Sequence, residues 1–307
     1  MSFGARFLRR PERFPERAEG EPWGGGELAL DLPGGPYRLA GLSAAQEEGV
    51  QATFPGCLLS PAAAARGISV QLFRSTPEDF LTVDARGWEY GLDSDWSPAA
   101  VRLAGLGLQA RLDWRPDLAG ALWTREDGGP SFPGVFENFL RVVVAYRLLE
   151  LGGVVLHSAG VVRGGVAFLF LGRSGAGKTT VARLSLAQGA EVLSDDLNAL
   201  ASSAGGCAVL KLPFTGDLGE RRATLPPVPL GALLRLEQAS ADAVAPLSRA
   251  ETLACLLACS PFVNVDPFRR DQLEQVLLAL LAAGAPRALA LRFSLRGGFW
   301  SILDAKA

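Results

Sequence analysis

Residues 172–179 read Gly-Arg-Ser-Gly-Ala-Gly-Lys-Thr, which fits in full the P-loop pattern of a glycine, four residues and then Gly-Lys-Thr. The glycines let backbone N–H groups turn inward around a polyphosphate, and a helix beginning near Lys178 points its positive end at the same anion. Lys178 supplies a cation for the β- and γ-phosphates, and the Thr179 hydroxyl can ligate Mg²⁺. The pattern therefore predicts a Mg·ATP phosphate site formed by Gly172, Arg173, Ser174, Gly175, Ala176, Gly177, Lys178, Thr179 and Thr180.

The segments on either side of this stretch have the order that a P-loop requires. The apolar run 166–171 predicts a strand before it, and Lys178 opens a predicted helix. Residues 154–162 predict a second strand, joined to 166–171 by a hairpin turn over residues 163–165. Residues 191–193 predict the next strand, which a right-handed crossover should lay beside 166–171 in parallel. The expected fold class is α/β, with the P-loop on a mixed sheet.

Two adjacent carboxylates, Asp195 and Asp196, come directly after the predicted strand 191–193. Because this strand and the one before the P-loop should end at the same sheet edge, we expect the pair beside the phosphates. One carboxylate could hold Mg²⁺, directly or through water, and the other could accept a proton from an attacking hydroxyl. A solvated loop or a helix N-cap would be the structural alternative for such a pair.

His157 is the only histidine of the chain. If the hairpin turns tightly over residues 163–165, residue 157 lies opposite residues 170–172, at the entrance to the P-loop. A histidine there could orient or polarise a catalytic aspartate, or contact a phosphate. A lone histidine is otherwise an ordinary buried imidazole, so this functional prediction depends on the register of the hairpin.

A polar, glycine-punctuated loop is predicted at residues 211–222. Near its end, Arg221 and Arg222 could neutralise a transferring phosphate, and Glu220 could reach the metal. A solvated surface loop explains the same residues equally well.

The chain divides by composition into three predicted parts. Residues 1–26 are rich in Arg, Glu, Pro and Gly and predict a flexible tail, and residues 27–133 predict a β-rich N-terminal domain. A Gly/Pro stretch at 127–133 marks the boundary to residues 134–307, the predicted P-loop domain. Strands are expected at 27–32, 69–73, 80–83, 106–114, 232–236 and 288–293, with helices at 137–151, after Ser248 with Glu251, and from Asp271 with Glu274.

Bulk composition excludes some classes of partner. The 307 residues are 49% apolar and carry a formal net charge of −2, so nothing predicts binding to nucleic acid or acidic lipid. No apolar run reaches membrane-spanning length, and the N-terminus lacks the apolar core of a signal peptide. We expect a cytoplasmic protein, and whether it forms a homo-oligomer is left open.

Two of the four cysteines, Cys255 and Cys259, have the i, i+4 spacing that places them on one helix face. Such a pair could suit a metal, but neither a histidine nor a third cysteine accompanies it. The surrounding Leu and Ala residues favour buried thiols that act as small apolar side chains.

Three segments in order carry a resemblance to a known family: His157-Ser158-Ala159-Gly160, the P-loop, and Ser194-Asp195-Asp196. They resemble the HPr kinase/phosphorylase family, and more closely the HPr-kinase-like proteins of bacterial gene clusters. Residues 229–233 and 249–251 are also similar, and the similarity covers about residues 136–300.

The resemblance implies a kinase domain related to phosphoenolpyruvate carboxykinase, which transfers phosphate to a serine hydroxyl of a protein or peptide. It implies that Asp195 is the catalytic base, His157 its assisting histidine, and Lys178 and Thr179 the phosphate and metal ligands. In the site predicted here, Asp196 and Glu220 complete the metal ligands. The family's downstream signature is matched only in part, at residues 220–222, so the acceptor protein is left open.

Two other functions fit the same residues. A regulatory module could bind the nucleotide and phosphorylate nothing, although binding alone does not need a base near the γ-phosphate. A small-molecule kinase could use the same scaffold, with the β-rich N-terminal region shaping its acceptor site. Transfer of phosphate to a serine of a protein or peptide is the leading hypothesis.

Overall fold

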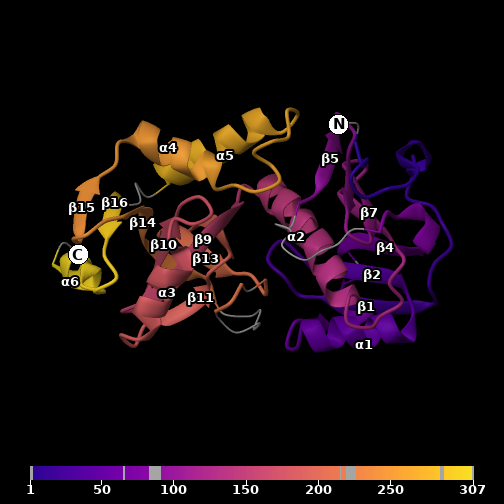
Figure 1. Ribbon diagram of the computed structural model, residues 1–307, viewed down its shortest axis with the longest axis horizontal. Helices are drawn as coiled ribbons and strands as arrows, with labels where there is room; N and C mark the ends of the chain where they lie inside the picture. Colours follow the sequence, from indigo (N-terminus) through magenta and orange to yellow (C-terminus); the bar gives the residue numbers. More distant parts are fainter. Residues whose placement is uncertain are drawn as a thin grey trace. The chain divides into compact units, whose positions relative to one another are not determined.

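The computed structural model describes residues 3–64, 66–82, 91–214, 216–218, 226–283 and 287–305. The chain forms two compact units, Met1–Val143 and Val144–Ala307, and the division falls within helix α2 (Phe132–Glu150). Each unit has its own mixed β-sheet, so the chain is a mixed α/β protein (Figure 1). Among the described residues, none of the helices combines the length and apolar character needed to span a membrane.

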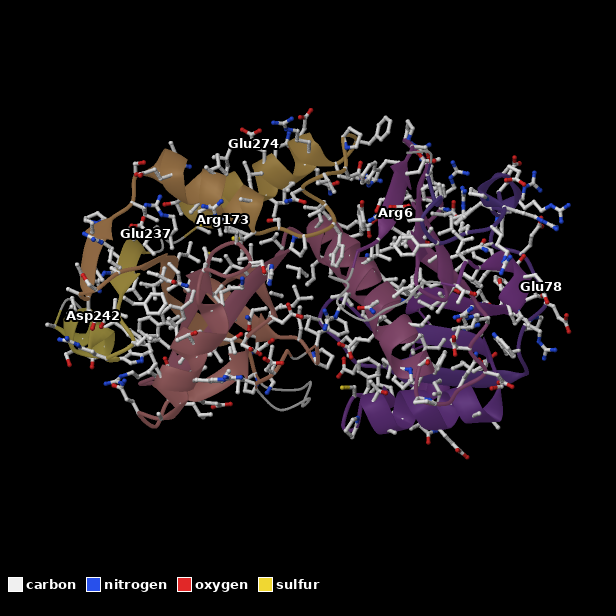
Figure 2. The ribbon with its side chains drawn as sticks, in the orientation of Figure 1. Arg6, Glu78, Arg173, Glu237, Asp242 and Glu274 are labelled. Carbon is white, nitrogen blue, oxygen red and sulfur yellow. The ribbon has the colours of Figure 1, made fainter. Side chains whose placement is uncertain are left out.

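The first unit is built on an eight-stranded sheet with the order β3-β1-β2-β4-β8-β7-β6-β5. Its strands are β1 (Gly26–Leu30), β2 (Tyr37–Leu42), β3 (Leu58–Leu59), β4 (Ile68–Arg74), β5 (Asp93–Trp96), β6 (Ala100–Gly105), β7 (Leu108–Asp113) and β8 (Ala119–Thr124). The unit also contains helix α1 (Ala44–Thr53) and the 3₁₀ helices η1 (Pro11–Arg13), η2 (Pro61–Ala64) and η3 (Pro77–Asp79). Charged side chains such as Glu78 point outward from it (Figure 2).

The strands predicted at 27–32, 69–73 and 106–114 correspond to β1, β4 and β7. The strand predicted at 80–83 is wrong for the residues described there, because Phe80 makes only an isolated bridge to Leu8. Residue 83 lies outside the described residues.

The N-terminal segment is packed rather than loosely held. Phe7, Leu8 and Phe14 are 2–4% exposed and form one cluster with Phe80 and Ala104. The sequence predicts this segment as a flexible tail, and the structure shows that a few of its large apolar side chains pack against the first unit.

The second unit is built on strands β9 (Val154–Arg163), β10 (Val166–Leu171), β11 (Glu191–Ser194), β12 (Leu197–Ser203), β13 (Gly206–Lys211), β14 (Val228–Gln238), β15 (Ala243–Pro246) and β16 (Ala288–Phe293). They follow the order β10-β9-β12-β13-β14-β16-β15, with β11 on β9 and an added pairing of β10 with β14. The helices are α3 (Lys178–Leu186), α4 (Arg249–Ala258), α5 (Arg270–Ala282) and α6 (Phe299–Asp304).

The predicted hairpin of β9 and β10 is confirmed. Arg163 pairs with Val166 across a two-residue turn, and the register runs to Ser158 opposite Leu171. Gly164 and Gly165 both have positive φ, at 61° and 79°, which a hairpin turn of this length requires and which glycine adopts without strain. The open end of the hairpin therefore brings residue 157 next to the start of the glycine-rich loop.

Strand β11 does not lie beside β10 as predicted. It pairs antiparallel with β9, with Glu191 opposite Val162, and β9 separates it from β10. The reason is that both edges of β10 are taken, one by β9 and the other by the parallel strand β14. Since β11 still runs in the same direction as β10, the two strands end at the same side of the sheet.

The predicted helix after Ser248 is confirmed as α4, whose N-cap Ser248 forms the reciprocal capping box with Glu251. The predicted helix near Asp271 is α5, but it begins at Arg270 after an N-cap without a side-chain hydrogen bond, so Asp271 is inside the helix. The strand predicted at 232–236 is the central part of the longer strand β14. The strand predicted at 288–293 is β16.

An apolar cluster fixes α3 and α6 on the sheet of the second unit. The rings of Phe170, Phe299 and Trp300 meet edge-on or tilted, and the Trp300 indole N–H donates to the Ser185 hydroxyl at 3.0 Å. Because Ser185 is on α3 and Phe170 is on β10, this cluster holds the helix and the strand that flank the glycine-rich loop.

Candidate functional site

The glycine-rich loop, residues 172–177, connects β10 to α3. Gly175 and Gly177 have φ values of 77° and 102°, in the region where a side chain is strained. A Cβ on Gly177 would also meet the Phe293 ring at 2.5 Å, and one on Gly172 would meet Ala176 Cβ at 2.6 Å. The fold therefore needs glycine at these positions, in agreement with the predicted motif.

Lys178 begins α3 and is held inside the loop. Its ammonium donates to the carbonyl oxygens of Gly172 at 2.9 Å and Arg173 at 3.3 Å, and the residue is 7% exposed. Burial lowers the Lys178 pKa below its ordinary value, while Cys259, Asp196 and Asp195 oppose this shift. The loop thus holds a partly desolvated cation beside two carboxylates.

The next residue of α3, Thr179, contacts the first aspartate of the pair. Its hydroxyl donates to Asp195 Oδ2 at 2.8 Å, and the backbone N–H of Leu218 donates to Asp195 Oδ1 at 2.9 Å. Asp195 is 5% exposed, so both of its carboxylate oxygens are engaged inside the protein. Asp195 therefore lies against the first turn of α3, directly after the glycine-rich loop.

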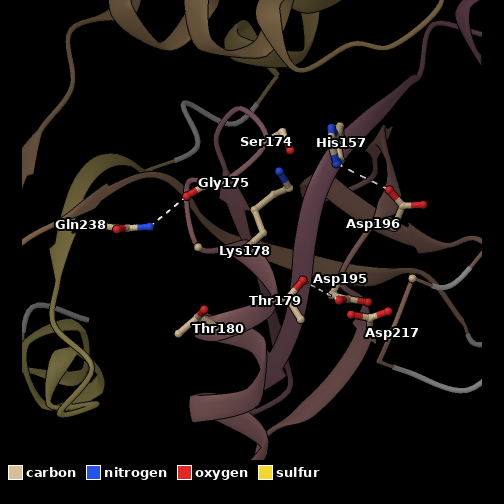
Figure 3. A pocket seen from close by; sticks show the side chains of 12 residues that line it. His157, Ser174, Gly175, Lys178, Thr179, Thr180, Asp195, Asp196, Asp217 and Gln238 are labelled. Atoms are coloured by element: carbon tan, nitrogen blue, oxygen red, sulfur yellow. Dashed lines mark hydrogen bonds and ion pairs between the residues drawn. The ribbon is translucent and has the colours of Figure 1, made fainter. Parts of the chain in front are cut away.

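His157 pairs with the second aspartate. The distance between His157 Nε2 and Asp196 Oδ1 is 3.6 Å, and the side chains are 41% and 24% exposed. The family resemblance had implied that the histidine assists Asp195. The structure gives it a different partner because Asp195 turns toward α3, whereas Asp196 turns toward β9 (Figure 3).

These groups face one pocket of about 420 Å³. Figure 3 shows Lys178, Thr179 and the aspartates around it, with Thr180 and Gln238 farther from His157. The lining residues are His157, Ser174, Gly175, Gly177, Lys178, Thr179, Thr180, Asp195, Asp196, Gly216, Asp217 and Gln238. Of the predicted loop residues, Gly172, Arg173 and Ala176 instead line the neighbouring pocket on the other side of the loop.

A hydrogen-bond network behind the pocket holds the turn at Asp195 and Asp196, and no sequence motif predicted this network. The Ser194 hydroxyl donates to Phe214 O at 3.0 Å and accepts from the backbone N–H of Asp196 at 3.1 Å. The Asn198 amide donates to Ser158 O at 2.8 Å. Asn198 lies two residues after the Ser194–Asp196 motif. It reaches Ser158 only because β12 pairs with β9, which places Asn198 opposite Leu156.

Gln238 and Cys259 were also missed as parts of the site. The Gln238 amide, at the end of β14, donates to Gly175 O at 2.9 Å. The Cys259 carbonyl accepts from the His157 backbone N–H at 2.7 Å. Both residues come from distant segments that only the folded sheet brings to the loop, whereas the predicted Glu220, Arg221 and Arg222 lie outside the described residues.

The donor atoms that converge on the pocket suit Mg²⁺ better than a transition metal. Among the described residues, no group of three or more His, Cys, Asp or Glu side chains could hold a metal ion. Mg²⁺ is commonly bound by one or two protein oxygens together with substrate phosphates and water. The Thr179 hydroxyl and Asp195 carboxylate, already in contact, are such oxygens.

The fold and the site define a mixed α/β protein with a glycine-rich strand–loop–helix element beside a histidine–aspartate pair. Residues 136–306 match the family model described as SynChlorMet cassette protein ScmC, and because this is more than half of the chain, the chain belongs to that family. No curated protein matches the chain.

Proposed function

We propose that this chain is a Mg·ATP-dependent phosphotransferase that moves the γ-phosphate to a hydroxyl group. One observation carries the proposal: a buried lysine in a glycine-rich loop, a threonine–aspartate contact and a histidine–aspartate pair face one pocket. Binding a nucleotide requires only the first of these. The second and third add a metal-binding oxygen pair and a proton acceptor, which phosphoryl transfer uses.

In the proposed site, the loop N–H groups and Lys178 bind the β- and γ-phosphates. Lys178 is suited to this role because its present partners are carbonyl oxygens, which a phosphate can replace with a stronger, charged acceptor. Thr179 and Asp195 would hold Mg²⁺. The metal, when bound, neutralises charge on the phosphate oxygens.

Asp196 is the proposed proton acceptor, in place of Asp195. Both Asp195 oxygens are engaged by Thr179 and Leu218, and the residue is 5% exposed. The Asp196 side chain is 24% exposed, so an acceptor hydroxyl can reach it. The distance from its Oδ1 to His157 Nε2 is 3.6 Å. The hydroxyl proton passes to Asp196, the hydroxyl oxygen bonds to the γ-phosphorus, and the bond to ADP breaks.

The acceptor class that we propose is a serine hydroxyl of a protein or peptide. It rests on the resemblance of residues 157–160, 172–179 and 194–196 to HPr-kinase-like proteins. The same resemblance leads us to propose that the glycine-rich loop and the mixed sheet of the second unit form an HPr-kinase-like domain.

The test separates the two aspartates in one assay. The full chain is incubated with γ-labelled ATP, Mg²⁺ and a degenerate array of serine-containing peptides. We expect label on serine, with about a 100-fold loss in Asp196→Asn, which removes the base. In Asp195→Asn we expect the Mg²⁺ concentration for half-maximal rate to rise about tenfold or more.

Two results would change this proposal. If Asp195→Asn shows the base phenotype and Asp196→Asn the metal phenotype, the roles are the reverse of those proposed. If the wild-type chain binds Mg·ATP but labels no peptide in the array, the regulatory nucleotide-binding module or the small-molecule kinase replaces the peptide kinase.

A further inference from the structure

A further pocket opens at the same edge of the sheet as the glycine-rich loop. Strands β10, β14 and β16 run parallel, and the last residues of β14 and β16, Gln238 and Phe293, are register partners. Beyond these strand ends lies a pocket of about 420 Å³, which we call the edge pocket. Ligands of α/β sheets collect at the carboxyl ends of parallel strands. The described residues that line the edge pocket are Thr180, Gln238, Ala239, Phe293 and Leu295.

The edge pocket adjoins the pocket that contains Lys178, called here the phosphate pocket. Thr180 and Gln238 line both pockets. The Phe293 ring lies against the last glycine of the loop, because a Cβ on Gly177 would be 2.5 Å from its Cζ atom. The edge pocket therefore begins where the glycine-rich loop passes into α3.

The proposed direction of transfer decides which end of a nucleotide lies at this boundary. His157 and Asp196 lie on one side of Lys178, whereas Thr180 and Gln238 lie on the other (Figure 3). The attacking and leaving oxygens are roughly in line in phosphoryl transfer. Since the acceptor hydroxyl comes from the side of Asp196, the rest of the nucleotide extends toward Thr180 and Gln238. That end of the phosphate pocket leads into the edge pocket.

The two pockets differ in charge as the two ends of a nucleotide do. The phosphate pocket contains the Lys178 ammonium and the carboxylates of Asp195 and Asp196. The five described residues that line the edge pocket are all uncharged, and they include a phenylalanine and a leucine. A largely apolar pocket with a few polar groups is typical of sites for ring systems. The edge pocket thus suits the base of a nucleotide and not its phosphates.

Leu295 gives the edge pocket a fixed apolar wall. It is 78% exposed, more than any other large apolar side chain in the described part of the chain. The turn that carries it is held from two sides, because the Ser294 N–H donates to Asp242 and the Gln188 amide donates to Gly297 O at 2.9 Å. A ring placed on Leu295 therefore removes apolar surface from water without first having to order the turn.

The larger pocket on the outer side of the loop is less suited to the nucleoside. It measures about 680 Å³, and Arg235, Glu237 and Glu251 line it together with apolar residues. Arg235 and Glu237 form an ion pair at 2.6 Å. Residues 172–176 also line this pocket, so a nucleotide bound there has to pass around the loop that holds its phosphates.

We propose that the edge pocket is the nucleoside subsite and that it selects a purine nucleoside triphosphate, with the base on Leu295 and against the Phe293 ring. This inference rests on the proposed phosphotransferase function and deepens it, because it names the class of nucleotide and the residues that select it.

The proposed selectivity follows from the lining. The two fused rings of a purine cover more of Leu295 than the single ring of a pyrimidine, and the gain grows with the apolar area covered. The lining side chains that can hydrogen-bond, Thr180 and Gln238, lie at the boundary with the phosphate pocket. A base held by apolar contact is distinguished by its size more than by its polar groups. The edge pocket therefore accepts adenine and guanine alike.

The first test compares four ligands on the full chain by isothermal titration: Mg·ATP, Mg·GTP, Mg·CTP and Mg·tripolyphosphate, which has no nucleoside. We expect ATP and GTP to bind with affinities within about threefold of each other, and about tenfold or more tightly than the other two. Equal affinity for ATP and tripolyphosphate would overturn the subsite. Equal affinity for ATP and CTP, or a strong preference for ATP over GTP, would overturn the selectivity.

Two variants then locate the nucleoside. Leu295→Ala should weaken Mg·ATP binding about tenfold and leave Mg·tripolyphosphate binding unchanged, because it removes only the apolar wall. The matched control is Ala254→Phe, at an exposed alanine of α4 that lines the pocket on the outer side of the loop. It should change neither affinity. Loss of ATP affinity in Ala254→Phe but not in Leu295→Ala would place the nucleoside in that outer pocket and overturn the inference.

Photolabelling places the base directly. The wild-type chain is irradiated with Mg²⁺ and an ATP that carries a photoreactive azide on its base, and the labelled peptide is identified by mass spectrometry. We expect the label on residues 293–297 or 238–239, and excess GTP should prevent it. Label on residues 249–259 of α4 instead would contradict the proposed subsite.

Tripolyphosphate separates a failure of this inference from a failure of the proposed function. If the wild-type chain binds neither tripolyphosphate nor ATP, the glycine-rich loop is not a phosphate site, and both proposals fail. If it binds the two ligands equally well, the nucleoside subsite fails and the phosphotransferase proposal stands.

Discussion

The two units treat charge differently. In the first unit, Arg102 and Asp95 form an ion pair between partly exposed side chains, and the buried Glu137 is matched directly by Arg141 at 2.7 Å. In the second unit, the buried Lys178 ammonium donates to backbone carbonyl oxygens, although Asp195 and Asp196 are close enough to affect its pKa. A cation held in this way keeps its charge available for an incoming anion, whereas a matched ion pair does not.

Such an arrangement costs stability. Taking a lysine out of water without a carboxylate in direct contact disfavours its charged form, which is the cause of the lowered Lys178 pKa. The first unit has no equivalent among its described residues, since the buried charged residue there, Glu137, has a charged partner. The second unit thus carries a cost in stability at Lys178 that the first unit does not, and each prediction below changes one side of this comparison.

The largest effect is expected from Lys178→Met. Removing the cation should reduce phosphate transfer by about 10²–10³-fold, as loss of a preorganised charge does in other enzymes. Since the folded-state pKa of Lys178 is lowered, the unfolded chain binds the proton more tightly, and the variant should be more stable than wild type at neutral pH. The gain should shrink as the pH rises from the folded-state pKa toward 10.5, which thermal unfolding at several pH values measures.

A matched control for this prediction is Lys211→Met, also at a buried lysine of the second unit but outside the pocket lining. Its phosphate transfer should change less than about tenfold, because Lys211 does not line the pocket. A Lys178→Met variant that transfers phosphate at the wild-type rate would contradict the role given to the loop.

The next effect concerns the shape of the loop. Gly177→Ala adds a Cβ at a φ of 102° that would meet the Phe293 ring at 2.5 Å, so the loop must move. We expect Mg·ATP affinity to fall by about tenfold or more, together with a loss of stability of about 1–3 kcal/mol. Isothermal titration and chemical unfolding measure the two quantities.

Gly165→Ala is a useful comparison for the loop variant. Its φ of 79° is equally unsuited to alanine, but its Cβ would meet nothing within 4 Å. This variant should lose stability without a matching loss of Mg·ATP affinity. Equal losses of affinity in both variants would mean that the loop has no special role.

A smaller effect is expected behind the pocket. Ser194→Ala removes the hydroxyl that bonds Phe214 O and the Asp196 N–H, at a residue that is fully buried. Loss of this contact should cost about 1–3 kcal/mol of stability, because the Phe214 carbonyl and the Asp196 N–H each lose a hydrogen bond. If Ser194 positions Asp196, the kcat of transfer should also fall while the KM for ATP stays near the wild-type value.

The smallest effect belongs to the first unit. Asp95→Ala removes the partner of Arg102 at a site where both side chains are more than a third exposed. Stability should change by less than about 1 kcal/mol, as is typical of surface ion pairs, and transfer should not change. A loss of transfer in this variant would show that the first unit contributes to the reaction.

Local features of the sequence were enough to predict several elements. Gly164 and Gly165 specify the hairpin, Ser248 and Glu251 specify the start of α4, and the glycines of 172–177 specify the loop, because each depends on a backbone angle or a capping bond formed within a few residues. The register of the hairpin then followed, and with it the position of His157 beside the loop.

Only the tertiary structure decided the contacts between segments that are distant in the sequence. The pairing of β11 with β9 depends on which edges of β10 are already occupied. The contacts of Thr179 with Asp195 and of His157 with Cys259 join segments that are far apart in the sequence. The burial of Phe7 and Phe14 depends on an apolar surface formed far along the chain, around Phe80 and Ala104. A sequence pattern carries periodicity and turn chemistry, whereas pairing and burial are decided by the sum of contacts in the folded chain.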